Sequence, residues 1–443
     1  EAINDITRDK IGVEIELSIT DFGSFNQNTT LALSANEEID VLACVGFPYA
    51  TGIQQGYLSD LEENDLIQTY GQGIIDAVGQ ENVDACRVNG VLYGLPSNRD
   101  IAQGRGCAAI ATEYLDGIGY EANTDDEIVK ISLDELNDIY AQLHEKYPDK
   151  EVYRPTTGSM SQFSNVDSLG GNVFGVLLDY GQNLDVVNLF ESDFYKDYCA
   201  RLYDYNQKGY ISADASTDTT AVGELVKAGT LMSYTTGGKP GIKAQETTLT
   251  GRDMTIFQTL DDYISSTSVA SMPWTIPISA QHKEAAMKFL NECYTNADIA
   301  NLLAWGIEGT HYKIGDDGLA TYADGVDASN SGWNHSMGWM MPNQFLTHVW
   351  EGNDPDLWTE MKEFNTNAKV SKASGFSFDS TNVANELTAV QNVYNEYQTS
   401  VEYGFVDPET GIAEMNDKMM TAGLQKIIDE KKAQLEAWQE ANK

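Results

Sequence analysis

The residues best suited to chemistry in this sequence form no complete catalytic or cofactor motif. The run GRGCAA at residues 104–109 matches the GxGxxA pattern of dinucleotide sites. That pattern requires a strand directly before it and a helix directly after it. The preceding strand is expected to stop at Pro96, and Asn98, Arg99 and Asp100 intervene. We therefore predict no nucleotide site here.

Other motifs are incomplete as well. Residues 237–239 (Gly-Gly-Lys) lack the glycine spacing and the Ser or Thr of a P-loop, the five histidines form no HExxH pair, and there is no GxSxG elbow. The segments around Asp316 and Asp407 do not follow the EF-hand register, although a looser calcium site stays open. We predict no catalytic residue, no cofactor and no metal ligand.

Aromatic residues beside Gly or Pro, or in loops, give a stronger signal. A sugar ring has an apolar C–H face and a rim of hydroxyls, so aromatic platforms with a few polar partners suit it. The alternative, that a given ring is core or hinge packing, is equally open for each of them. The rings placed in this way are Phe47, Tyr49, Tyr234, Trp274, Trp305, Trp333 and Trp339.

The charge balance excludes several classes of partner. The chain has 68 acidic and 27 basic residues, a net charge of −41. Such a surface repels nucleic-acid phosphates and anionic lipids, and it favours a soluble monomer. We expect no nucleic-acid or membrane-surface binding. An anionic ligand is disfavoured too, unless Arg99 or Arg105 faces it.

The five cysteines are scattered and odd in number. A disulfide framework is not expected in a chain this large, so we predict buried thiols. Only the pairing of Cys86 with Cys107 is left open.

Helices and strands are expected to alternate along 443 residues, the pattern of an α/β protein with two or three domains. In the first part, an amphipathic helix ends at Lys10 before Gly12, and the alternation of residues 11–19 predicts a strand. A helix over 28–36 and a buried strand over 39–45 follow.

Later segments carry local signals. Asn89-Gly90 predicts a tight hairpin, Ser132 with Glu135 predicts a capped helix that ends near Pro148, and Asn296 caps a helix to Trp305. Further expectations are helices over 191–207, 221–228 and 281–294, strands over 230–235 and 269–279, loops over 236–241 and 315–334, and two helices near the C-terminus.

Several motifs, most of them in the second half of the chain, carry a resemblance to a known family. They are VKAGTLM at 226–232, KEAAMKFL at 283–290, LLAWGIEGTHY at 302–312, GWMMPNQF at 338–345 and GFSFD at 375–379. The sequence resembles extracellular solute-binding proteins of ABC importers, carbohydrate family 1, in their lipoprotein branch with a long C-terminal extension. It departs from the family at His282-Lys283, where Pro is common, and in the missing first strand. Residues before Glu1, including a lipoprotein signal, are therefore expected.

The resemblance implies an α/β, two-lobe, periplasmic-binding-protein-like (type II) fold with a helical C-terminal extension. Lobe 1 would comprise residues 1–100 plus 272–313, and lobe 2 residues 101–271 plus 314–443. Ligand would lie between the lobes, which close by a hinge motion.

The resemblance also implies the contact residues. Tyr49, Trp305 and Trp339 would stack on the ligand, and Asn98, Arg99 and Glu308 would hold hydroxyls. Arg99 with Asp100 is equally well explained as a structural ion pair. The full set is Phe47, Tyr49, Asn98, Arg99, Tyr234, Trp274, Trp305, Glu308, Trp333 and Trp339.

The implied function is that of an extracellular, membrane-anchored lipoprotein that delivers a carbohydrate to ABC permease subunits without being an enzyme. The number of aromatic rings favours an oligosaccharide, of undetermined identity and length. Two alternatives stay open: a surface adhesin or scaffold without a small ligand, and a carbohydrate-active enzyme, since 68 acids yield some suitably spaced carboxylate pair by chance.

Overall fold

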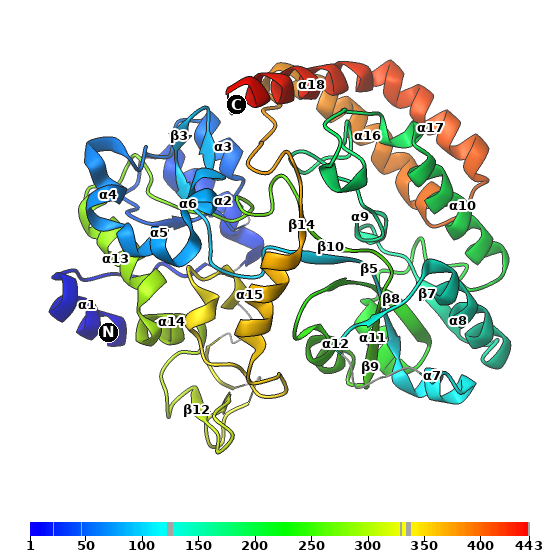
Figure 1. The fold of residues 1–443 in the computed structure, drawn as a ribbon, viewed down its shortest axis with the longest axis horizontal. Coiled ribbons are helices and arrows are strands. Elements are labelled where there is room, and N and C mark those ends of the chain that lie inside the picture. Colours follow the sequence, from blue (N-terminus) through cyan, green and yellow to red (C-terminus); the bar gives the residue numbers. More distant parts are fainter. Residues whose placement is uncertain (21, 46, 122–126, 328–329, 334–337, 442–443) are drawn as a thin grey trace. The chain divides into compact units, whose positions relative to one another are not determined.

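Two sets of chain segments, each with its own hydrophobic core, make up the protein (Figure 1). The computed structural model describes residues 1–20, 22–45, 47–121, 127–327, 330–333 and 338–441. Unit 1 comprises Glu1–Ile101 and Thr267–Met361, and unit 2 comprises Ala102–Ser266 and Lys362–Lys443. Both contain helices and sheet, as the α/β prediction requires. None of the described helices is long and apolar enough to cross a bilayer.

Unit 1 contains a three-stranded antiparallel sheet. Its order is β1 (Leu42–Ala43), β11 (Trp274–Thr275), β4 (Gly94–Leu95). The described helices of this unit are α1 (Ala2–Ile11), α2 (Phe22–Ser34), α3 (Tyr49–Gln54), α4 (Leu66–Tyr70), α5 (Gln72–Val78), α6 (Gln80–Asp84), α13 (Lys283–Thr295), α14 (Ala297–Ala304) and α15 (Leu357–Asn367), whose last residues belong to unit 2. Two hairpins complete it, β2 (Arg87–Val88) with β3 (Val91–Leu92) and β12 (Tyr312–Ile314) with β13 (Ala320–Tyr322).

Two local signals of unit 1, a hairpin turn and a helix cap, are confirmed. Asn89 and Gly90 adopt φ angles of 52° and 82°, as a two-residue hairpin turn between β2 and β3 demands. The Asn296 side chain accepts the Asp298 backbone N–H at 3.0 Å and so caps α14. In both cases the residues that predicted the turn or the cap also form it.

The strand predicted over residues 11–19 is wrong. Residues 13–20 form neither strand nor helix, and Ile19 is 78 % exposed. Asn4 makes two hydrogen bonds to the backbone of Ile15, at 2.8 and 3.0 Å. Alternation of polar and apolar residues predicts which side chains of a strand would share a face, but a strand also needs a neighbouring strand to pair with. No strand in the described part of the chain pairs with residues 13–20. The strand predicted over 39–45 is likewise reduced to β1.

Unit 2 is built on a seven-stranded mixed sheet. Its main order is β14 (Lys369–Val370), β10 (Asp262–Ile264), β5 (Gln103–Ala111), β8 (Leu231–Gly238), β7 (Glu151–Arg154). Strand β9 (Met254–Gln258) pairs with β5 and with β6 (Val129–Lys130). The run at 104–109 therefore lies inside β5 and not at a strand-to-helix turn. Strand β8 continues through Gly238, where a loop was predicted from Thr236.

Helices flank this sheet. They are α7 (Thr112–Ile118), α8 (Leu133–Lys146), α9 (Ser159–Gln162), α10 (Asp193–Gln207), α11 (Val222–Ala228) and α12 (Ile242–Thr250). The Ser132 side chain accepts the Glu135 N–H at 3.1 Å, so the predicted cap of α8 is confirmed. Short 3-10 helices occur at Glu63–Asp65, Asp179–Gly181, Leu189–Glu191, Gly338–Met340, Gln344–Leu346 and Thr381–Val383.

Three helices, not the predicted two, end the chain: α16 (Ala384–Glu402), α17 (Pro408–Ala422) and α18 (Leu424–Ala441). Asp407 caps α17, whose first residue is a proline, and Gly423 with a φ of 114° separates α17 from α18. Figure 1 shows α16 and α17 alongside α10, against which both pack.

Residues 314–361 lie in unit 1, whereas lobe 2 was the prediction. The Asn343 side chain donates to the Tyr294 carbonyl at 2.7 Å, and the His348 N–H donates to Asn301 Oδ1 at 2.8 Å. These bonds fasten the segment to α13 and α14. The partners lie far away in sequence, so no local pattern could indicate them.

All five cysteines are buried and free, as predicted. Cys86 lies in the core of unit 1 and Cys107 in the core of unit 2, so the open question of their pairing is answered: they do not pair.

A fully buried lysine of α18 binds the 168–175 segment of unit 2. Lys431 Nζ donates to the carbonyls of Ser168, Asn172 and Gly175 at 2.9, 3.0 and 2.9 Å, which uses all three ammonium protons. Burial lowers the pKa of Lys431 to about 7, and the charge of Asp167 opposes this shift. The geometry suits the charged form, because a neutral amine has only two protons to donate.

We predict that Lys431→Met destabilises the protein by about 3 kcal/mol or more, because several buried carbonyls lose their donor. The neighbouring Lys432 is exposed, so Lys432→Met is the matched control and should change stability by less than about 0.5 kcal/mol. Urea unfolding of the three proteins measures both effects. Equal midpoints for the two variants would show that the buried ammonium does not stabilise the fold.

Candidate ligand-binding residues

Three of the aromatic residues singled out in unit 1 are core residues. Phe47 is 1 %, Trp305 7 % and Tyr49 9 % exposed. The Tyr49 hydroxyl donates to the Cys86 carbonyl at 2.7 Å, and Trp305 Nε1 donates to the His348 carbonyl at 3.1 Å. The Trp305 ring also packs on Trp350, with centroids 4.9 Å apart. Their ring faces are covered, so packing describes Phe47, Tyr49 and Trp305 better than stacking on a sugar.

Tyr234 of unit 2 is also a core residue. It lies in β8, and its hydroxyl donates to the Glu246 carboxylate of α12. Burial, reinforced by the Glu246 charge, raises the pKa of this phenol far above its ordinary value. Tyr234 thus stays neutral and supports the sheet rather than offering a ring face.

The other three candidate tryptophans, Trp274, Trp333 and Trp339, lie in unit 1 and keep exposed surface. Trp274 Nε1 donates to the Met340 carbonyl at 3.3 Å, and Trp339 is the residue before Met340. Trp333 Nε1 donates to the Leu303 carbonyl of α14, also at 3.3 Å. All three rings are half-buried. The indole nitrogens of Trp274 and Trp333 are held by backbone, so these two rings are fixed while part of each stays accessible.

The polar candidates divide into anchored and exposed groups. The Asn98 N–H donates to the Pro342 carbonyl at 2.8 Å, and its side chain donates to the Ala77 carbonyl at 3.1 Å. Asn98 therefore adjoins the 338–343 segment that holds Trp339. Arg99 forms an ion pair with Asp100 at 3.4 Å and donates to Ser271 Oγ at 2.8 Å, so the ion-pair alternative is observed. Glu308 is exposed.

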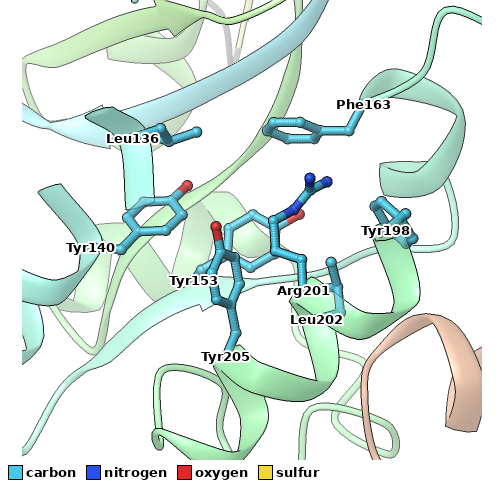
Figure 2. Close-up of a pocket in the computed structure, with 8 residues that line it drawn as sticks. All are labelled: Leu136, Tyr140, Tyr153, Phe163, Tyr198, Arg201, Leu202 and Tyr205. Carbon is cyan, nitrogen blue, oxygen red and sulfur yellow. The ribbon is translucent and has the colours of Figure 1, made fainter. Parts of the chain in front are cut away.

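One pocket in unit 2 was missed by the sequence reasoning (Figure 2). It is narrow, and the tyrosines in its wall are almost fully buried. The Tyr140 and Tyr153 hydroxyls are bonded to Ser233 and Thr235, at 2.9 and 2.7 Å. The signal was the Tyr-rich run of α10, for which the sequence predicted only a helix over 191–207. The lining residues are Leu136, Tyr140, Tyr153, Phe163, Tyr198, Arg201, Leu202 and Tyr205.

A buried carboxylate holds α10 against the C-terminal helices. Glu402 accepts hydrogen bonds from the hydroxyls of Tyr195 and Tyr394, at 3.1 and 2.7 Å, and from Gln398 Nε2 at 3.1 Å. Burial raises the pKa of Glu402 to about 7, although these three donors favour the charged form. Glu402 thus fixes the N-terminal half of the helix that carries Arg201.

One group of three possible metal ligands occurs among the described residues: Glu38, Asp40 and His282, with ligand atoms within 4.8 Å of one another. Asp40 accepts the His282 N–H at 3.0 Å at the start of α13, which accounts for their proximity. In the segments around Asp316 and Asp407, Asp407 caps α17 and Asp317 accepts the Leu319 N–H.

The fold defined by these two units is that of the solute-binding proteins, and comparison with known proteins confirms the resemblance found in the sequence. A crystal structure of the N-glycan transport solute binding protein NgtS from Streptococcus pneumoniae matches with a TM-score of 0.85, at 23 % identity over 99 % of this chain and 95 % of that one. The structure of NgtS in complex with Man1GlcNAc matches with a TM-score of 0.75, at 23 % identity over 98 % and 94 %.

A curated relative extends the similarity to sequence. The carbohydrate ABC transporter substrate-binding protein of Streptococcus pneumoniae serotype 4 (strain ATCC BAA-334 / TIGR4) is 25 % identical over 448 aligned positions, 97 % of this chain and 86 % of that protein. Residues 372–440 match a family model described as a domain of unknown function, DUF3502. That segment comprises most of the C-terminal extension predicted from the resemblance.

The raised pKa of Glu402 predicts a pH dependence of stability. Between its ordinary pKa of 4.5 and its folded value of about 7, the folded chain keeps a proton that the unfolded chain has lost. The contribution of Glu402 to stability is therefore greatest below pH 4.5 and falls as pH rises to 7. The melting temperature of the wild type, relative to that of Glu402→Gln, should therefore fall as the pH rises from 4.5 to 7.

Thermal melts of both proteins at half-unit pH intervals measure this difference. Glu396 is exposed on the same helix, so Glu396→Gln controls for the loss of one acidic side chain. A difference between wild type and Glu402→Gln that is constant from pH 4.5 to 7, or that grows in favour of the wild type, would contradict the prediction.

Proposed function

We propose that this protein binds a carbohydrate outside the cell and delivers it to an ABC importer. The observation that carries the proposal is similarity along nearly the whole chain to a relative named as a carbohydrate transporter's substrate-binding protein. The solved proteins of the same fold include NgtS, crystallised with Man1GlcNAc and with Man5GlcNAc. The number of aromatic rings favours an oligosaccharide over a monosaccharide.

Trp274, Trp333 and Trp339 are the proposed platforms for the sugar in unit 1. Each keeps an exposed part, and the backbone holds the indole nitrogens of Trp274 and Trp333, so little side-chain freedom is lost when a ring stacks there. Asn98, Arg99 and Glu308 stay proposed partners for hydroxyls. Phe47, Tyr49, Tyr234 and Trp305 are assigned to support, because their rings are covered.

Transfer by hinge closure belongs to the same proposal. A ligand shifts a conformational equilibrium only by its preference for one state, so the sugar must bind the closed form more tightly than the open one. Small-angle scattering with and without a bound oligosaccharide tests this step, and the radius of gyration should decrease on binding.

The remaining parts of the proposal concern partners and location. We infer that the protein acts outside the cell as a monomer, anchored as a lipoprotein, that the permease is formed by other chains, and that no bond of the sugar is broken. Prolonged incubation of a bound oligosaccharide at high protein concentration should return it intact. A sugar panel that gives no melting shift at all would favour the adhesin or scaffold alternative, since binding raises the melting temperature.

We predict that Trp339→Ala weakens binding of the oligosaccharide by about 1–3 kcal/mol, because a stacking surface is removed. Calorimetric titration with the tightest-binding sugar of a melting-shift panel measures the change. Trp358 is also half-buried, and its indole nitrogen donates to the Thr347 carbonyl at 2.7 Å, so Trp358→Ala is the matched control. Unchanged affinity for Trp339→Ala, or an equal loss in the control, would remove Trp339 from the site.

A further inference from the structure

Arg105 is a half-buried arginine without an acidic partner. It lies in β5, and its Nη1 donates to the Ser161 carbonyl at 2.9 Å. Its guanidinium lies 5.7 Å from the centre of the Tyr263 ring. The nearby carboxylate of Asp167 is already bonded to Ser266 and to the Leu169 N–H. Arg105 makes no ion pair with any described residue, and burial lowers its pKa.

Arg201 of α10 is the second such arginine. Its guanidinium lies 5.7 Å from the ring centre of Phe163 and 5.4 Å from that of Tyr198. Figure 2 shows it inside the aromatic pocket, close to Phe163. Within the described chain it has neither an ion pair nor a hydrogen-bond acceptor, so its N–H groups are available to a ligand or to solvent.

This isolation is unusual for the chain. Acidic residues outnumber basic ones by 68 to 27, and each of the other arginines has a carboxylate partner. Burying part of a guanidinium without an ion pair is costly, since a carbonyl or a ring face replaces the removed water only in part. The paired arginines are Arg8, Arg87, Arg99, Arg154 and Arg252.

Both unpaired arginines contact one short segment. Arg105 binds the carbonyl of Ser161, in α9, and Arg201 packs on Phe163, two residues later. Gln162 lies between Ser161 and Phe163 in the sequence, and its side-chain Oε1 is buried without a partner among the described residues. The same holds for Nε of Arg105. Buried polar atoms without partners are rare in folded proteins and point to a missing water, ion or ligand. The 161–163 segment therefore lies beside unused donors, an unused acceptor and two guanidinium groups that form no ion pair with any described residue.

We propose that Arg105 and Arg201 bind a carboxylate of the ligand beside the 161–163 segment, so that the natural ligand is an acidic carbohydrate. This inference rests on the proposed function. A neutral glycan would accept hydrogen bonds from the N–H groups but would leave both guanidinium groups without an ion pair. A carboxylate accepts the same hydrogen bonds and also forms the ion pair, and hydrogen bonds between guanidinium and carboxylate are stronger than those to neutral acceptors. The net charge of −41 repels an acidic ligand at long range, so local positive charge is required for it to bind.

The experiment compares acidic sugars with matched neutral ones. Trigalacturonic acid and its methyl ester have the same sugar backbone and differ in charge and in the added methyl groups. Sialyllactose and lactose differ by the acidic residue, and Man5GlcNAc is a neutral reference. We expect an acidic probe to bind at least about tenfold more tightly than its neutral counterpart, and this preference to shrink in 0.5 M salt. Arg105→Gln or Arg201→Gln should abolish the preference, and Arg105→Lys should retain part of it.

Arg252→Gln is the matched control, because Arg252 lies in the same unit but is paired with Glu113. Loss of the acid preference in either variant, with the preference intact in the control, supports the inference and identifies the arginine responsible. Binding of neutral sugars alone, or a preference that survives both substitutions, overturns it and leaves the proposed function standing. If no saccharide binds at all, both fail.

Discussion

Backbone pairing of strand β5 is the interaction on which unit 2 depends. β5 pairs with β8 and β9 over most of its length and with β10 at its start, and residues 107–111 are fully buried. Small side chains make this possible. Gly106 adopts a φ of 67°, and a Cβ there would collide with the Thr259 side chain. Arg105 lies between Gly104 and Gly106, and a Cβ on Gly104 would lie only 3.0 Å from the Cα of Gly238 in β8. The close approach of neighbouring strands to β5 thus occurs on either side of Arg105 in the sequence.

The C-terminal extension is part of unit 2 and not an added module. Tyr394, Met415 and Leu424 belong to the same hydrophobic cluster as Cys107 of β5. Lys431 and Glu402 reinforce that packing with buried polar groups whose hydrogen bonds go to the 168–175 segment and to α10. The segment that matches the domain of unknown function in this chain thus completes a core, and we expect that it does not fold alone.

Local chemistry explains what the sequence could predict. The caps at Ser132 and Asn296 and the turn at Asn89-Gly90 depend on residues within a few positions, so their patterns are sufficient. The α/β class follows from periodicity, and the resemblance supplied the two-lobe fold. Predictions that need a distant partner were the ones that failed: the strand over 11–19, and the placement of 314–361.

The candidate site shows the same limit. Tyr49, Trp305 and Trp339 share a similar sequence setting, yet Tyr49 and Trp305 are covered by residues from other segments whereas Trp339 is half-exposed. Arg105 was visible in the sequence, inside a glycine pattern that the structure places within β5. What the sequence could not reveal is that this guanidinium forms no ion pair with a described residue, because that depends on which segments β5 meets.

The buried thiols have a practical consequence for work with this protein. Burial raises the pKa of Cys44 and of Cys107 to about 12, and the other three thiols are shifted in the same direction. Maleimide reagents attack thiolates, so all five native cysteines should react slowly while the protein is folded. A fluorophore can therefore be attached through one cysteine introduced at an exposed position, with no need to delete the native five.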